Sequence, residues 1–321
     1  MTVTIGVDLG GTKTAAGLVA ADGTVLRRVS APTPAASGPQ SVLRTIVDLA
    51  ISLTDSAPDV IAGCGIGAAG VIDPVSRTVK FATNSLPGWT GTRLGAEIED
   101  RLGMPVATVN DVHAHAIGEA VHGAGRGERT VLVIAAGTGI GGALVIDGVL
   151  QSGRHGAAGH YGHVPAAEAA GLACTCGGVG HLEVIASGPA ILAAYLRRGG
   201  AAAGDTQEIF ARADAGDALA AEVIAVAAAA LGRTIGGLIN SVDPDVVIVG
   251  GGLAAAGRRW WDAVEGQART EAMGLLAGCL IVPTSLGADS AIVGAASLIA
   301  TTTVDTTLRP CTDQHLNGFP E

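Results

Sequence analysis

Residues 6–18 read GVDLGGTKTAAGL, and this stretch places a glycine-rich turn between two runs of strand-forming residues. The first run, residues 3–8, is rich in β-branched residues and stops at the glycine pair, and the second, residues 14–20, follows directly. A D-G pair then turns the chain into a third run, residues 25–29. Strand runs joined by such short turns predict a meander of two β-hairpins.

The first turn has the composition of a phosphate site. Paired glycines leave successive backbone N–H groups unobstructed, and a threonine hydroxyl and a lysine charge follow them. An aspartate at the end of the preceding strand could hold a metal-bound water beside the phosphates. A tight hairpin with a turn aspartate explains the same residues equally well, and the spacing of a Walker A loop is absent. The candidate phosphate-binding residues are Asp8, Gly10, Gly11, Thr12 and Lys13.

The same unit occurs a second time. GALVIDGVL (142–150) parallels GLVAADGTVL (17–26), and each segment follows a strand that ends in a Gly-Thr turn, which indicates an internal duplication. The second turn has the spacing G-x-G-x-x-G, but a strand rather than a helix follows it, which argues against a Rossmann site. The sequence predicts a second phosphate hairpin here. A third glycine cluster, at the end of a later strand, would let an adenosine lie close to the backbone, although alone it is only a strand-to-helix turn. Their residues are Gly137, Thr138, Gly139, Gly141 and Gly142, then Gly250 and Gly251.

Strands and helices alternate over the rest of the chain. Apolar runs predict strands over 60–69, 106–109, 130–136, 143–146 and 246–249. Helical spacing predicts helices over 41–53, 94–102, 112–121, 188–198, 205–213, 218–240 and about 290–300. The chain is therefore predicted to be an α/β protein.

The composition excludes several classes of protein. Lys and Arg number 19 against 29 Asp and Glu, a net charge of −10 with no basic cluster, so we expect no nucleic acid and no membrane partner. The apolar runs are too short or too interrupted to span a bilayer, and no basic segment precedes the first strand. Five cysteines, two of them in a C-x-C pair, predict a reduced, cytoplasmic protein.

Asn110 and Asp111 lie between a predicted strand and a predicted helix. Asn and Asp are preferred helix N-caps, and this position is where a cap belongs, so the local sequence favours that role. The functional alternative is a general base, because phosphoryl transfer to an alcohol needs a carboxylate near the attacking hydroxyl.

A metal site is predicted from His163, Cys174, Cys176 and His181. Two thiolates and two imidazoles suit tetrahedral Zn²⁺, and four protein ligands indicate a structural rather than a catalytic ion. Chance can also place a histidine beside a C-x-C pair, so the site is a hypothesis.

In their order these motifs resemble the ROK family of sugar kinases and sugar-responsive repressors, within the actin-like ATPase superfamily. The resemblance runs from Val3 to about Ala300. Its carriers are GVDLGGTKTAAGL (6–18), SLPGW (85–89), NDVHAHAIGEA (110–120), GTGIGGALVIDGVLQSGRHGAAGHYGH (137–163), CTCGGVGHLEVIASG (174–188) and VIVGGGL (247–253).

The resemblance implies an α/β fold of two actin-like (ribonuclease H-like) lobes with a central nucleotide and sugar cleft. The first lobe would span residues 1–109 and the second, with the zinc motif, residues 110–287. The final helix, about 288–300, would return to the first lobe, and residues 301–321 would form a loose tail.

The resemblance also implies the activity: ATP with Mg²⁺ would phosphorylate the 6-hydroxyl of a hexose or N-acetylhexosamine, with Asp111 as the catalytic base. Family members are commonly homodimers or homotetramers. A repressor is disfavoured, since only five residues precede Gly6 and leave no room there for a helix-turn-helix domain. The implied sugar contacts are Asn84, Asn110, Asp111, His160, His163 and Glu183.

Two positions depart from the family pattern. The zinc site usually has three Cys and one His, but the last Cys is His181 here; imidazole is also a zinc ligand, so we expect the site to persist. Glucose-phosphorylating members usually have Glu where this chain has His160, and a His there resembles the bacterial N-acetylmannosamine kinases. An imidazole can donate a hydrogen bond to an acetamido oxygen. N-Acetylmannosamine is therefore the favoured substrate and glucose the alternative.

Overall fold

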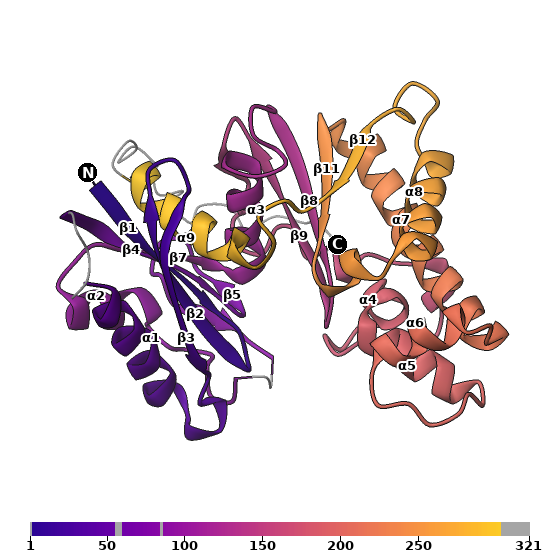
Figure 1. Ribbon diagram of the computed structural model, residues 1–321, viewed down its shortest axis with the longest axis horizontal. Helices are drawn as coiled ribbons and strands as arrows, with labels where there is room; N and C mark the ends of the chain where they lie inside the picture. Colours follow the sequence, from indigo (N-terminus) through magenta and orange to yellow (C-terminus); the bar gives the residue numbers. More distant parts are fainter. Residues whose placement is uncertain (1, 55–59, 84–85, 303–321) are drawn as a thin grey trace, which may run out of the picture.

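The computed structural model describes residues 2–54, 60–83 and 86–302, and in it two five-stranded sheets lie on either side of a central pair of helices (Figure 1). The order of the first sheet is β3-β2-β1-β4-β7. Its strands are β1 (Thr2–Leu9), β2 (Lys13–Ala20), β3 (Val25–Pro32), β4 (Val60–Ala68) and β7 (Val106–Asn110). β1, β2 and β3 pair antiparallel, which confirms the predicted meander, and β4 and β7 continue the sheet in parallel.

The second sheet repeats this arrangement, with the order β10-β9-β8-β11-β12. Its strands are β8 (Thr130–Ala136), β9 (Ile140–Ile146), β10 (Val149–Leu150), β11 (Val246–Gly250) and β12 (Leu280–Pro283). Again three strands are antiparallel and two are parallel. The duplication inferred from the two Gly-Thr turns is therefore confirmed at the level of topology.

Each sheet has its own helices and its own buried core. The first is covered by α1 (Pro39–Thr54) and α2 (Leu94–Leu102), and its core includes the fully buried Trp89. The second is covered by α4 (Glu183–Ala186), α5 (Gly188–Arg197), α6 (Thr206–Asp214), α7 (Ala218–Val242) and α8 (Arg258–Glu271). A small hairpin of β5 (Val71–Ile72) and β6 (Val79–Phe81) completes the first half.

The predicted helices and strands occur within a few residues of their expected bounds, but α8, β12 and the small β5–β6 hairpin were not predicted. α8 is mostly polar, and its buried residues are Trp260, Val264 and Ala268, a narrow stripe at four-residue spacing. β12 has only four residues, none of them fully buried, because it lies at the sheet edge. Short edge strands carry little apolar pattern.

α7 is 25 residues long and apolar enough to cross a membrane by length and composition alone. In the structure this helix packs against α8 and α6, and residues such as Ile224, Leu231 and Ile235 are buried in the core of the second half. α7 is thus accounted for as the core helix of this sheet.

The central pair consists of α3 (Asp111–Val121) and α9 (Ser290–Thr302), which pack directly on each other. A side chain at Gly294 would overlap the carbonyl of Ala114, so the two backbones touch. α9 follows β12 of the second sheet but packs on β1, β2 and β4 of the first. The lobe boundaries proposed from the sequence stay a prediction, and residues 303–321 of the expected tail lie outside the described residues.

Candidate functional site

Both sheets present the carboxyl ends of parallel strands at the centre of the molecule. In the first, Leu9, Ala68 and Asn110 stand next to one another in register at the ends of β1, β4 and β7. In the second, Ala135 of β8 pairs with Gly250 of β11. Loops at such strand ends commonly form ligand sites in α/β sheets.

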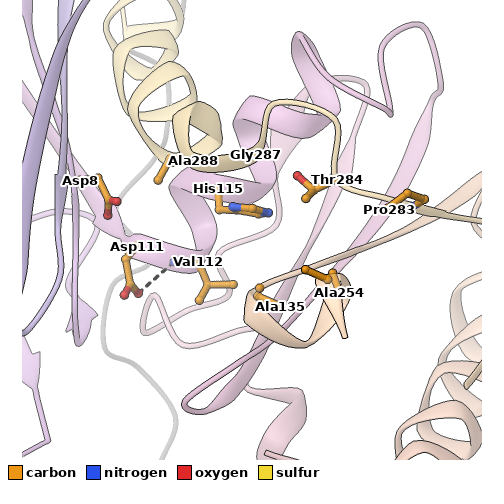
Figure 2. Close-up of a pocket in the computed structure, with 13 residues that line it drawn as sticks. Asp8, Asp111, Val112, His115, Ala135, Ala254, Pro283, Thr284, Gly287 and Ala288 are labelled. Carbon is orange, nitrogen blue, oxygen red and sulfur yellow. Dashed lines mark hydrogen bonds between the residues drawn. The ribbon is translucent and has the colours of Figure 1, made fainter. Parts of the chain in front are cut away.

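A cavity of about 550 Å³ lies between these edges (Figure 2). Asp8 comes from β1 and Asp111 from the start of α3, and their carboxylates lie on the same side of the cavity. Gly251 follows β11, and Thr284 follows β12, so elements of both sheets contribute walls. The cavity therefore brings together two carboxylates that the sequence separates by about a hundred residues.

Asn110 is the N-cap of α3, as its local sequence suggested. Its side-chain oxygen accepts hydrogen bonds from the backbone N–H groups of Val112 (3.0 Å) and His113 (3.3 Å). Its amide nitrogen donates to the carbonyl of Gly70 (2.9 Å) and to Oδ1 of Asp111 (2.8 Å). Oδ1 of Asp111 also accepts from the N–H group of Val112 (2.9 Å), so the Asp111 carboxylate is oriented by Asn110 and by the first turn of the helix.

The two carboxylates are electrostatically strained. Burial and, next to it, the charge of Asp111 raise the pKa of Asp8 to about 6, against the opposing charges of Arg28 and Lys13. Burial also raises the pKa of Asp111, against the opposing effect of the N–H group of Val112 and the amide of Asn110. Carboxylates with raised pKa values in one cavity are typical of a functional site.

Substitution of Asp8 by asparagine is expected to stabilise the nucleotide-free protein above pH 6. A raised pKa in the folded state gives stability that is present below 3.8 and lost as the pH rises through about 6. A neutral amide avoids that loss, so unfolding free energies from urea titrations should exceed those of the wild type by about 3 kcal/mol at pH 8 and be equal near pH 3.

Asp73→Asn is the matched control. Hydrogen bonds from the backbone and side chain of Ser76 lower the pKa of Asp73, so its carboxylate stabilises the fold at neutral pH. This variant should lose stability at pH 8, the opposite sign to Asp8→Asn. If neither variant is more stable than the wild type at pH 8, or if both are, the raised pKa of Asp8 is not the cause of the effect.

The two glycine turns lie at the corresponding places of the two sheets. The first joins β1 to β2 and is closed by a hydrogen bond from Gly10 N to Lys13 O (3.0 Å). The second joins β8 to β9 and is closed from Gly137 N to Gly139 O (2.9 Å). The main chain of Gly11 and Thr12 thus stands at one hairpin tip and that of Thr138 at the other.

Some of the singled-out glycines have a packing reason of their own. A side chain at Gly142 would overlap the carbonyl of Val133 and the ring of Tyr161. Gly251 has φ +84°, and a side chain there would overlap the main chain of Ala136. These two residues are required by close backbone packing, whatever the ligand.

A second cavity, of about 620 Å³, adjoins the first and shares Ala255 with it. Gly137 and Thr138 of the second hairpin line it together with the beginnings of α5 and α6, and the N–H group of Gly188 donates to the carbonyl of Gly137 (2.8 Å). The half-buried ring of Phe210 lines it as well. This cavity is large enough for a nucleoside, which typically fills a few hundred Å³ of such a pocket.

The residues implied as sugar contacts lie on neighbouring elements, except Asn84, which is outside the described residues. Glu183 begins α4, and its Oε2 accepts a hydrogen bond from the backbone N–H of Ile140 (2.9 Å), at the second glycine turn. The rings of His160 and His163 are stacked at 6.1 Å. The Nδ1 of His160 lies 2.8 Å from the carbonyl of Ala157, which fixes the proton on Nδ1.

The four predicted metal ligands converge. One potential ligand atom from each of His163, Cys174, Cys176 and His181 lies within 4.8 Å of the others. Sγ of Cys174 is 3.6 Å from Nδ1 of His163, and Sγ of Cys176 is 3.2 Å from Nδ1 of His181. Ligands on a tetrahedral zinc ion are about 3.5 Å apart, given the usual Zn–S and Zn–N lengths. The donor set and its spacing fit Zn²⁺.

His115 and Glu119, which were not predicted as site residues, lie on the same face of α3 as Asp111. His115 lines the first cavity, and within the described part of the chain its Nε2 has no hydrogen-bond partner. The spacing of Asp111, His115 and Glu119 is i, i+4, i+8, and this pattern could have revealed them once the helix was predicted. Thr284 has no comparable local signal.

Two sheets of this shared topology, each with a glycine hairpin, and two carboxylates in a cavity walled by both sheets define the class: a protein of the actin-like ATPase fold. A ROK family model matches residues 4–302, and the chain belongs to the ROK family.

Individual relatives support the same assignment. The chain is 35% identical to a glucokinase of Thermotoga maritima over 311 residues, 92% of this chain and 96% of that one. It is 35% identical to an N-acetylmannosamine kinase of Escherichia coli over 254 residues, 79% and 84% of the two chains. A ROK family glucokinase of Streptomyces griseus, solved with glucose and AMPPNP, is 33% identical with a TM-score of 0.79, covering 93% of this chain and 99% of that one. The protein is an ATP-dependent sugar kinase.

Proposed function

We propose that this kinase transfers the γ-phosphoryl group of ATP to the 6-hydroxyl of a hexose or N-acetylhexosamine, with N-acetylmannosamine as the favoured substrate and glucose as the alternative. The observation that carries the proposal is the placement of Asp111 beside Asp8 in a cavity walled by both sheets. A carboxylate with a raised pKa, held at that point, is suited to accept the proton of an attacking alcohol.

The nucleotide would extend across both cavities. Its base and ribose would occupy the second cavity, near Phe210 and Gly252, with Gly251 at the border of the first cavity. Its phosphates would extend from the turn at Gly137 and Thr138 toward the turn at residues 10–13. Backbone N–H groups, the hydroxyls of Thr12 and Thr138 and the charge of Lys13 are suited to that anion. Asp8 would hold Mg²⁺ through a water, and this ion supplies charge neutralisation during phosphoryl transfer. These assignments are part of the proposal.

Asn110 and Glu183 would orient the sugar around the base. The amide of Asn110 already donates to Asp111, which fixes the carboxylate toward the cavity. One oxygen of Glu183 is held by the second hairpin, so a sugar bound to the other oxygen would be positioned relative to the phosphates. Such positioning accounts for much of the catalysis in phosphoryl transfer.

His160 would contact the sugar at the position that distinguishes the two candidates. Because its Nδ1 donates to Ala157, the Nε2 of the neutral ring is an acceptor. This corrects the physical reason given from the sequence, which assigned the ring a donor role toward an acetamido oxygen. A neutral ring instead suits an acetamido N–H or a hydroxyl, and both substrates offer one of these donors.

A zinc ion bound by the four metal ligands would also fix the position of two proposed sugar contacts, His163 and Glu183. Since Nδ1 of His163 faces Cys174, its Nε2 is on the opposite side of the ring and could bind a sugar hydroxyl. His181 is two residues from Glu183, so the same ion would fix the start of α4. A bound Zn²⁺ supplies structural cross-linking at this place.

The remaining partner assignments are proposals as well. We propose a homodimer or homotetramer, in the cytoplasm, with no nucleic acid or membrane partner. The exposed apolar side chains of Met273, Leu275 and Leu280 would be buried in a contact between subunits.

The test of the proposed function is a panel of ADP-release assays with glucose, mannose, N-acetylglucosamine and N-acetylmannosamine. We expect kcat/KM to be highest for N-acetylmannosamine, with the product phosphorylated at O6 by NMR. A preference for glucose selects the alternative, and no turnover with any hexose contradicts the proposal.

His160→Glu is expected to shift the preference toward glucose by about tenfold in the ratio of the two kcat/KM values, the effect of one well-placed hydrogen-bonding group. A carboxylate accepts from two adjacent hydroxyls, which an imidazole cannot do. The control is His155→Glu, the same change at an exposed site on the same loop. An unchanged ratio in His160→Glu means that residue 160 does not set the choice.

A further inference from the structure

Glu119 is a buried carboxylate that the proposed chemistry does not use. It lies on α3 two turns after Asp111, and its side chain is fully buried. A buried charge is costly unless hydrogen bonds compensate it, so its presence calls for an explanation.

The hydrogen bonds to Glu119 come almost entirely from one segment, residues 284–290, which we call the β12–α9 connection. The backbone N–H groups of Ser285 (3.0 Å) and Leu286 (2.9 Å) and the hydroxyls of Thr284, Ser285 (3.2 Å) and Ser290 (2.7 Å) all donate to it. One further donor, the N–H group of Ala124 (3.1 Å), belongs to the turn after α3.

These donors keep the carboxylate ionised. Burial disfavours its charged form, but the hydrogen bonds from Thr284, Ser285 and Ser290 outweigh burial and lower the pKa of Glu119 to about 2. Both oxygens are occupied by donors from the protein, which leaves the group no role as a proton acceptor for a substrate.

The β12–α9 connection is also a wall of the first cavity. Thr284, Gly287 and Ala288 line it together with Asp8 and Asp111, with Ala288 on the side of Asp8 and Thr284 on the far side (Figure 2). The same segment carries the chain from the second sheet to α9, which packs on the first. Glu119 therefore joins the helix that bears Asp111 to a second wall of the same cavity.

We propose that Glu119 is a positioning residue that holds the β12–α9 connection in register with Asp111, so that bound ATP meets the base at the right distance. The proposal rests on the function proposed above, because it assigns this cavity to the phosphoryl end of the nucleotide. An error of about 1 Å in such a geometry can cost on the order of 100-fold in rate.

Glu119→Gln tests it with little change of shape. An amide NH₂ would confront the N–H groups of Ser285 or Ala124, so the connection should shift while α3 stays in place. We expect kcat to fall at least about tenfold and KM for ATP to rise at least about threefold. The Kd for the sugar without nucleotide should stay within about twofold of the wild-type value, because none of the proposed sugar contacts lies on the β12–α9 connection and α3 stays in place.

Glu99→Gln is the matched control, since Glu99 also joins two elements, through Arg77 (2.6 Å), but away from the cavity. It should leave kcat and both binding constants unchanged. Ser290→Ala, which removes one donor without altering the cavity lining, provides a milder variant if Glu119→Gln does not fold; we expect a two- to fivefold rise in the KM for ATP.

If Glu119→Gln folds, either of two results overturns the proposal. One is a wild-type kcat and a wild-type KM for ATP; the other is an equal loss of sugar affinity and nucleotide affinity in this variant, as a general structural defect would give. Should Glu119→Gln not fold, a wild-type KM for ATP in Ser290→Ala overturns it too. The Kd of a non-hydrolysable ATP analogue separates this proposal from the proposed function. If the wild type phosphorylates no hexose but Glu119→Gln still raises the Kd of the ATP analogue at least threefold, the proposed sugar substrate fails and the role of Glu119 stands.

Discussion

Asp111→Asn is expected to lower kcat by about 10²–10⁴-fold while the protein stays folded and binds sugar with near-normal affinity, because a general base contributes a factor of that size. Asparagine keeps an oxygen that can accept from the N–H group of Val112 (2.9 Å in the wild type), so the start of α3 should be preserved. The measurements are steady-state turnover and sugar binding by calorimetry.

The competing explanation of Asp111 is a helix-terminal carboxylate with no chemical role, and Asp217→Asn controls for it. Asp217 is the N-cap of α7, where it accepts from the N–H group of Ala220 (3.0 Å) and the hydroxyl of Tyr195 (2.5 Å). This variant should lose some stability and keep its turnover. Near-normal turnover in Asp111→Asn would reject Asp111 as the base.

Removal of the zinc ligands is expected to have the second large effect. The wild type, purified without chelator, should contain one zinc per chain, and Cys176→Ala should contain much less. Structural zinc contributes several kcal/mol or more where its loop has little other support. We expect a fall in Tm of about 10 °C, since each kcal/mol moves Tm by about 2–4 °C in a chain of this size class.

Loss of zinc should also weaken the sugar site. His163 and Glu183 are held by the same short segment, so we expect the Kd for sugar to rise by about 10–100-fold, the range found when groups supporting a metal site are removed. Limited proteolysis should then cut between residues 163 and 183. Cys279→Ser is the control, because this partly buried thiol donates only to backbone carbonyls, including that of Pro244 (3.5 Å). The ligand set is contradicted if the wild type contains almost no zinc, or if Cys176→Ala contains as much zinc as the wild type.

The two hairpin units were predictable because their signals are local. The β1–β2 turn and its copy between β8 and β9 each place glycines directly between strand-forming residues, and the repeat between 17–26 and 142–150 is visible in the letters alone. The metal ligands were predictable for a similar reason, since three of the four lie within eight residues.

The cavities could not be predicted in the same way, because their walls come from distant parts of the chain. Thr284 has no local pattern that marks it, and it becomes a wall residue only because β12 pairs with β11. The second cavity needs the beginnings of α5 and α6 beside the turn at Gly137.

The two strand-and-turn units, Asp8 and Asp111 after their strands, and the four metal ligands follow from the amino-acid sequence, since each depends on the chemistry of neighbouring residues. The shared cavity of Asp8 and Asp111 and the binding of segment 284–290 by Glu119 exist only in the folded chain. Those contacts join residues about 100 and 165 positions apart, and such pairs form only when both sheets pack on the central helices. Burial in that packing is also what raises the pKa of both aspartates.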